Sequence, residues 1–239
     1  VHRHRLPMAG LELDTRERIF DELQKNDVHF VTNAKVEQLQ TGSDAKVHHV
    51  ITNRGTFEAD IVVLSLGVAP NVGLAKQANI RLGTTGAIAT NERQQTSADD
   101  VFAAGDCCEV KNVVSGKTMY IPLATYASRA GWVAGENAAG GRATFKGVIR
   151  AIAVKVFGIE VAQVGLSSDE AKEAGFEVIT ASITSYAKVA LMPESKKVTV
   201  KMIIDSKSHR LLGANVYGED GAALRANTLG VAIQQKLTV

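Results

Sequence analysis

A carboxylate follows a glycine directly at the end of an apolar run in VFAAGDCCEV, residues 101–110. Gly105 has no side chain, so a ligand can approach its backbone closely. Asp106 carries two oxygen acceptors that suit the hydroxyl groups of a polyol or ribityl chain. Both residue types also favour turns, so for this pair alone an ordinary turn is an equally good interpretation.

A helix that begins after Pro122 would supply the other half of such a site. Residues 122–141 are rich in alanine and glycine, and their small side chains recur at helical spacing. Free N–H groups in its first turn, at Leu123, Ala124 and Thr125, carry partial positive charge. They suit a group that gains negative charge on reduction, such as the pyrimidine edge of a flavin.

For the other residues that could take part in chemistry, we favour a structural role. Cys107 and Cys108 are the only cysteines, and adjacent cysteines close only a strained ring, so we interpret them as small buried hydrophobes. The six histidines have no spacing that suits zinc, and we predict no metal site. We expect Trp132 in the packed core.

The elements that must position these residues follow from the apolar patterns. Helices are expected over residues 15–26, with Asp14 as N-cap, and over 122–141, 167–175 and 221–236. Strands are expected over 28–32, 34–40, 46–53, 57–67, 149–165, 176–184, 196–205 and 210–219, with two short strands within 86–106. The run FEADIVVLSLG, 57–67, is apolar almost throughout, which is typical of a strand covered on both faces.

Composition bounds the class of protein. With 239 residues and 45% apolar residues, the chain can build one large or two ordinary domains. A net charge of +2 and an aromatic content of 5% argue against nucleic acid as a partner. No apolar stretch is long enough to span a bilayer, and no secretory signal is visible. We therefore expect a cytoplasmic α/β protein without a membrane partner.

Two segments together resemble a known family. TSADDVFAAGDCCEV followed by PLATYASRAGWVAGENAAGG is similar to the second FAD-binding segment of the pyridine nucleotide–disulfide oxidoreductases. The nearest branch contains NADH oxidases, NADH peroxidases and coenzyme A-disulfide reductases. FEADIVVLSLGVAPN resembles the end of that family's NAD(P) domain, and the segments from VGLSSDEAKEAGFEV onward resemble its dimerisation domain.

The resemblance implies an architecture. A partial three-layer, Rossmann-like α/β part would be followed by an α+β dimerisation domain. Residues 1–81 would be the end of the NAD(P) domain, 82–147 the second FAD segment, and 148–239 the dimerisation domain. The implied partner is a second copy of the chain.

The resemblance also implies FAD and either NADH or NADPH as cofactors. Asp106 would bind the ribityl chain beside the backbone of Gly105. After Pro122, the backbone groups of Leu123, Ala124 and Thr125 would meet the isoalloxazine ring. Gly67 would lie where the nicotinamide and flavin domains meet. Arg3 and Arg5 lie near the place where the family reads the ribose 2′ position, which slightly favours NADPH, although a solvated basic terminus is an equally good interpretation.

The implied activity passes hydride from NAD(P)H to FAD and then electrons to a cysteine, with a disulfide, polysulfide, peroxide or dioxygen as acceptor. The 239 residues of the chain contain neither the family's Gly-x-Gly-x-x-Gly fingerprints nor its redox cysteine. We therefore expect a fragment of a longer protein and no catalytic residue within it. The alternative is a catalytically silent dimerisation fragment without cofactor. Leu191-Met192-Pro193 replaces a frequent Tyr-Tyr-Pro of coenzyme A-disulfide reductases, which argues against that acceptor.

Overall fold

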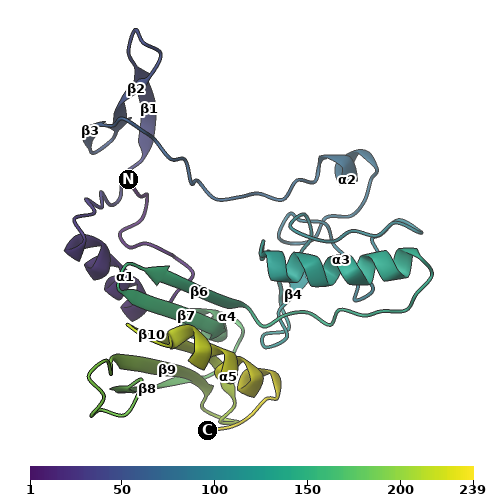
Figure 1. Cartoon of the computed structure of the whole chain (residues 1–239). Coiled ribbons are helices and arrows are strands. Elements are labelled where there is room, and N and C mark those ends of the chain that lie inside the picture. The colour runs from purple at the N-terminus through teal and green to yellow at the C-terminus, as the bar shows by residue number, and fades with distance from the viewer.

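A five-stranded antiparallel sheet organises the C-terminal half of the computed structural model, which describes residues 1–239 (Figure 1). The sheet has the strand order β6-β7-β10-β9-β8. Its strands are β6 (Ala151–Val156), β7 (Ile159–Gly165), β8 (Val178–Tyr186), β9 (Lys197–Asp205) and β10 (Leu211–Gly218). The run expected as one strand over 149–165 is two strands, because Phe157 and Gly158 turn the chain back between β6 and β7.

The two faces of this sheet are covered by different helices. Helix α5 (Ala222–Gln234) packs on β7 and β10, and the core there includes Val164, Val216 and Ile233. The short helix α4 (Ser168–Glu173) begins in a capping box between Ser167 and Glu170. This half of the chain therefore has its own apolar core, as expected of an α+β unit.

Helix α1 (Leu13–Lys25) covers the opposite face of the sheet, where Leu11 and Ile19 pack on Val161. Its N-cap is Glu12 and not the predicted Asp14, whose carboxylate instead accepts a hydrogen bond from its neighbour's backbone N–H. The N-terminal part of the chain is thus bound to the C-terminal sheet.

A small antiparallel meander follows α1 and stands apart from the sheet (Figure 1). It consists of β1 (Val36–Thr41), β2 (Val47–Thr52) and β3 (Gly55–Glu58) in that order. The expected strand over 28–32 does not form: these residues carry no regular structure.

The prediction of a strand covered on both faces over 57–67 is wrong. Strand β3 ends at Glu58, the Ala59 N–H still donates to the His48 carbonyl, and the chain then runs without regular structure to helix α2 (Gly73–Gln77), as Figure 1 shows. Val63 is 85% exposed. The physical reason is the lack of a neighbour, because no strand of this chain lies alongside the segment to complete its hydrogen bonds.

A second lobe surrounds helix α3 (Ala124–Ala138), which fits the predicted alanine-rich helix (Figure 1). It contains the two-stranded pair β4 (Val110–Lys111) and β5 (Thr118–Met119). The strands expected within 86–106 are reduced to isolated bridges, such as that between Gln95 and Phe102. Trp132 was expected in the core, but it is 79% exposed on α3.

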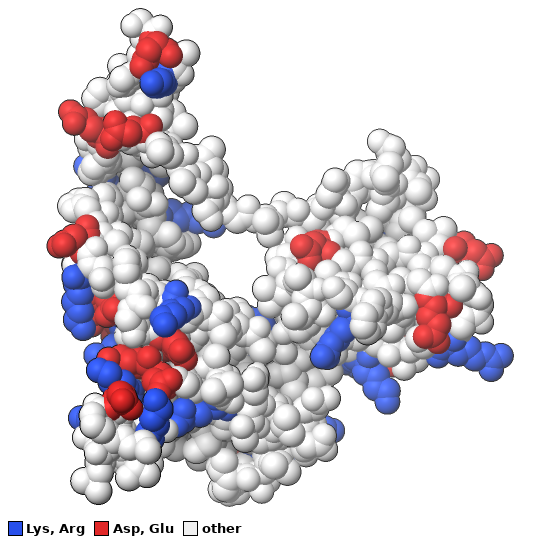
Figure 2. Space-filling model, in the orientation of Figure 1, with Lys and Arg blue, Asp and Glu red and all other residues white.

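Charged side chains of both signs are interspersed on the face drawn in Figure 2, most densely over the lobe that holds the five-stranded sheet. Charged side chains of the sheet domain form ion pairs, for example Lys196 with Glu219 at 3.3 Å and Lys188 with Asp220 at 3.2 Å. None of the helices combines the length and the apolar character that a bilayer crossing needs.

Candidate functional site

The Gly105–Cys108 segment forms a compact turn. The N–H of Cys108 donates to the Gly105 carbonyl at 3.0 Å, and Gly105 has a φ of +92°, a conformation that favours glycine. Asp106 is exposed at the outside of this turn, and its carboxylate makes no hydrogen bond or ion pair within the chain. The turn thus presents a free acceptor beside an open backbone.

The first turn of α3 presents free donors. Leu123 is its N-cap, and its carbonyl accepts from the N–H groups of Tyr126 and Ala127 at 2.9 and 3.1 Å. The N–H groups of Ala124 and Thr125 have no acceptor within the chain, and both residues are exposed. Unpaired N–H groups at a helix start favour a negatively charged or electron-rich group.

The turn and the helix are neighbours. An ideal Cβ placed on Gly105 would lie 4.0 Å from the Cβ of Ala127, so glycine and alanine keep the two elements close. Tyr120, just before the helix, is close enough to the same turn to be affected by its charges. Burial raises the pKa of Tyr120, and the negative charges of Asp106 and Cys107 raise it further. The structure therefore brings together most of the residues that the sequence singled out as a flavin site.

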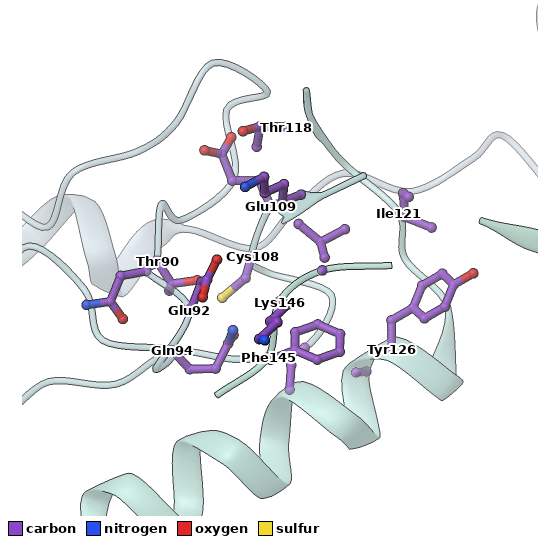
Figure 3. Close-up of a pocket in the computed structure, with 17 residues that line it drawn as sticks. Thr90, Glu92, Gln94, Cys108, Glu109, Thr118, Ile121, Tyr126, Phe145 and Lys146 are labelled. Carbon is purple, nitrogen blue, oxygen red and sulfur yellow. The ribbon is translucent and has the colours of Figure 1, made fainter. Parts of the chain in front are cut away.

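A hollow of about 330 Å³ lies between these elements (Figure 3). Its walls combine small residues, two aromatic rings and charged side chains of both signs; they include Gly105, Cys108, Tyr126, Ala127, Ala130 and Phe145 together with Glu92, Glu109, Lys111 and Lys146. The free Asp106 carboxylate and the N–H groups of Ala124 and Thr125 belong to the same turn and helix start but are not part of this lining; they are the groups that suit the polyol chain and the polar edge of a flavin.

The two cysteines differ from their predicted role in one respect. Cys108 packs with Ala75 and Ile88 in a small apolar cluster, in accordance with a buried hydrophobe. The thiols nevertheless converge, with 3.8 Å between the Sγ atoms of Cys107 and Cys108. The sequence analysis considered only the strained ring of a disulfide between neighbours, and did not consider that a turn can place the two thiols side by side without a bond.

The remaining predicted residues lie away from this turn. Arg5 pairs with Glu17 at 3.6 Å near the start of α1, and Arg3 is exposed without an ion pair. Gly67 lies in the unpaired segment before α2, with a φ of +89°. Figure 1 shows the N-terminus and α3 in different lobes, so this chain alone does not bring Arg3 and Arg5 to the Gly105 turn.

Most residues that line the hollow were not predicted from the sequence, and two of them are aromatic. Tyr126 lies on the predicted helix, and its hydroxyl donates to the Ile149 carbonyl at 2.9 Å and accepts from the Ala151 N–H at 2.8 Å. Tyr126 lies in the predicted first turn of this helix, in PLATYAS, and this position was the only sequence signal for it. Phe145 arrives from the loop after α3 and carries no sequence signal for this position.

Comparison with family models and curated proteins gives consistent results. The model described as pyridine nucleotide-disulphide oxidoreductase matches residues 1–131, and that of the corresponding dimerisation domain matches residues 152–239. An NAD(P)H sulfur oxidoreductase (CoA-dependent) of Pyrococcus furiosus is 41% identical over 175 residues, which are 73% of this chain and 40% of that protein. An NADH oxidase of Enterococcus faecalis is 32% identical over 218 residues, 91% of this chain and 49% of that protein.

Solved structures agree over nearly the whole chain. An NAD-dependent persulfide reductase from A. fulgidus superposes with a TM-score of 0.92 at 33% identity, over 99% of this chain and 44% of that chain. A FAD-dependent pyridine nucleotide-disulphide oxidoreductase from Desulfovibrio vulgaris gives a TM-score of 0.84 at 33% identity, over 99% and 57%. The chain thus spans roughly half the length of these relatives or less.

Proposed function

The chain belongs to the pyridine nucleotide-disulphide oxidoreductase family, and from this premise we propose that it supplies part of a flavin-dependent NAD(P)H oxidoreductase. The observation that carries the proposal is the contact between the Gly105 turn and the open first turn of α3. Gly105, Tyr126 and Ala127 line a hollow there, while the free Asp106 carboxylate and the unpaired N–H groups of Ala124 and Thr125 belong to the adjoining turn and helix start.

FAD is the proposed cofactor, and it would supply the acceptor for a hydride. Asp106 would accept hydrogen bonds from ribityl hydroxyl groups beside the backbone of Gly105. The N–H groups of Ala124 and Thr125 would donate to the pyrimidine edge and stabilise negative charge there. Pro122 and Leu123 would set the direction of the helix start.

NADH or NADPH is the proposed hydride donor, with Gly67 near the nicotinamide end. The two relatives named above carry NAD(P)H and NADH in their names. Arg3 has no ion pair and Arg5 holds only an exposed one, so both side chains can turn to a 2′-phosphate. The proposed preference for NADPH predicts that replacing both arginines with alanine raises the KM for NADPH more than that for NADH.

The electron acceptor is proposed by class. The relatives named above are a sulfur oxidoreductase, a persulfide reductase and an NADH oxidase, and these names support a disulfide, a polysulfide or dioxygen as the electron acceptor. Peroxide is the fourth proposed acceptor. In the proposed enzyme a cysteine outside these residues takes the electrons from the flavin. We propose the cytoplasm, where NAD(P)H is available, as the place of action.

We also propose a homodimer, with residues 148–239 as the dimerisation domain after 1–81 and 82–147. A dimerisation model matches residues 152–239. The edge strand β8 and the loop after it expose apolar side chains, and Leu191 is 94% exposed. Light scattering of the purified chain should give twice its 25.4 kDa mass. A monomer at micromolar concentration would contradict this proposal.

A chimera tests the proposed flavin site. This chain replaces the region that it matches in the A. fulgidus persulfide reductase, and the purified product is examined for flavin absorbance and NAD(P)H consumption. We expect a yellow protein that consumes NAD(P)H, and we expect Asp106→Ala to lose flavin.

Asp99→Ala is the matched control, because Asp99 is an exposed carboxylate that lies just before the same run. It should leave the flavin content unchanged. A folded but colourless chimera, beside a yellow parent reductase, would refute the site and favour the alternative of a dimerisation module without cofactor.

A further inference from the structure

The Cys107 and Cys108 thiols form a convergent pair. Both cysteines are free, and their Sγ atoms lie 3.8 Å apart. The turn closed by the Cys108 N–H and the Gly105 carbonyl places the two neighbouring side chains on the same side. Two sulfurs bound to one tetrahedral centre, with bonds of about 2.3 Å, are also separated by about 3.8 Å. A pyramidal three-coordinate centre has narrower bond angles and holds its two sulfurs slightly closer, so a single thiophilic atom can bridge this pair after a small adjustment of the two side chains.

The pair can be reached. Cys107 is half-buried, and Cys108, although only 8% exposed, lines the hollow of about 330 Å³. Figure 3 shows the Cys108 sulfur among the labelled residues of this hollow. Gln94 and Phe145 also line this hollow, whose volume can hold a small organic group.

The surroundings select the kind of ligand. No group of three or more histidine, cysteine or acidic side chains is placed to hold a metal ion, so a four-coordinate zinc site has too few ligands. Burial raises the pKa of the Cys108 thiol, and the negative charge of Cys107 raises it further, so Cys108 is protonated at neutral pH. A ligand that reacts with a protonated Cys108 thiol fits this pair better than a divalent cation that requires two thiolates.

We propose that Cys107 and Cys108 form a dithiol site for a trivalent, thiophilic centre of the arsenic(III) type. For a monosubstituted arsenical, R–As=O, two As–S bonds form and the arsenic–oxygen bond breaks. Both thiol protons leave with the oxygen as one water molecule. No atom changes its oxidation state, so the step needs no oxidant or reductant. The site does not depend on the proposed flavin activity.

The test uses the purified 239-residue chain and phenylarsine oxide under anaerobic conditions. We expect one arsenical per chain, a mass increase equal to the arsenical less one water, and the loss of both titratable thiols. A small dithiol should reverse the reaction, whereas a monothiol should not. Absence of a stable adduct, with both thiols still titratable after unfolding, would overturn the proposal.

Two variants make the test specific. Cys107→Ser and Cys108→Ser each keep one sulfur, and we expect each to bind the arsenical about 100-fold more weakly, because the second attachment is lost. Cys107 is half-buried, so its variant should fold even if Cys108→Ser does not; circular dichroism checks this. Retention of the arsenical by folded Cys107→Ser at undiminished strength would overturn the proposal, since one sulfur would then suffice.

Discussion

The Thr15 hydroxyl donates a hydrogen bond to the Asn215 side-chain oxygen at 2.9 Å, across 200 positions of sequence, and both residues are fully buried. The Asn215 amide in turn donates to the Gln163 side-chain oxygen at 2.7 Å. Gln163, Asn215 and Lys201 stand opposite one another on β7, β10 and β9 and form one polar row below α1. Because buried polar groups must be paired, this row specifies how α1 lies on the sheet.

The first prediction concerns Lys201 at the end of this row. Its Nζ lies 2.7 Å from Glu12 Oε2 and 3.4 Å from Asp14 Oδ2. Lys201→Met leaves the buried Glu12 carboxylate without its cation, so we expect the free energy of unfolding to fall by about 3 kcal/mol. Urea denaturation measures this loss.

Lys196→Met is the matched control for that variant. Lys196 pairs with Glu219 at 3.3 Å, but about half of each side chain is exposed. Its removal should cost less than about 1 kcal/mol. Equal losses for the two variants would show that burial does not distinguish the pairs.

The second prediction concerns acid. Burial by itself would raise the pKa of Glu12, but hydrogen bonds from Lys201 and Ser168 outweigh it, and the pKa lies below the ordinary value of 4.5. A carboxyl group with a depressed pKa in the folded state stabilises fully above its unfolded pKa and loses this contribution as the pH falls through its folded pKa. The stability difference between the native chain and Glu12→Gln should therefore shrink as the pH falls below 4.5. Urea denaturation at a series of pH values measures it, and a difference that stays constant would contradict this assignment.

The third prediction concerns the link between α3 and the sheet domain. The Tyr126 hydroxyl joins the Ile149 carbonyl and the Ala151 N–H at 2.9 and 2.8 Å. Tyr126→Phe removes both bonds, and we expect a loss of about 1–2 kcal/mol in thermal or urea unfolding. Tyr120→Phe is the control, because the Tyr120 hydroxyl makes no hydrogen bond within the chain and its removal should cost little. If the control loses as much, the cost does not come from the two bonds.

The folded elements that sequence patterns predicted well are those whose partners lie within the chain. Strand β9 and helix α5 both carry apolar residues at the spacing that their secondary structure needs to face the core. Their bounds lie close to the predicted ones. Residues 57–67 have an equally strong strand pattern but remain unpaired beyond Ala59. A pattern reports what a segment can pair with, whereas the strand forms only where a neighbour completes its hydrogen bonds.

The candidate site divides in the same way. Gly105 and the helix start after Pro122 carry local signals, namely a backbone preference and a fixed φ, so sequence alone indicated them. The convergence of the two thiols depends on the turn geometry after Gly105. The polar row below α1 joins positions too distant in sequence for any local pattern to connect.

The last prediction compares a glycine that the backbone conformation requires, Gly105, with a glycine inside helix α3, Gly131. Gly105 has a φ of +92°, and an added Cβ would make only ordinary contact with Ala127, at 4.0 Å. Gly105→Ala should therefore lose about 1–2 kcal/mol in urea unfolding through backbone strain alone. Gly131 lies within α3 with no atom near an added Cβ, so Gly131→Ala should stabilise by up to about 1 kcal/mol.

The same glycines distinguish strain from occupancy in the chimera. Gly105→Leu adds a side chain directed at Ala127 and into the hollow, so it should lower the flavin content well beyond Gly105→Ala, although both variants carry the same backbone strain. Flavin absorbance per folded protein measures this difference. Equal flavin content in the two variants would mean that the gap between the turn and α3 does not receive the cofactor, because filling it would then have had no effect beyond the strain.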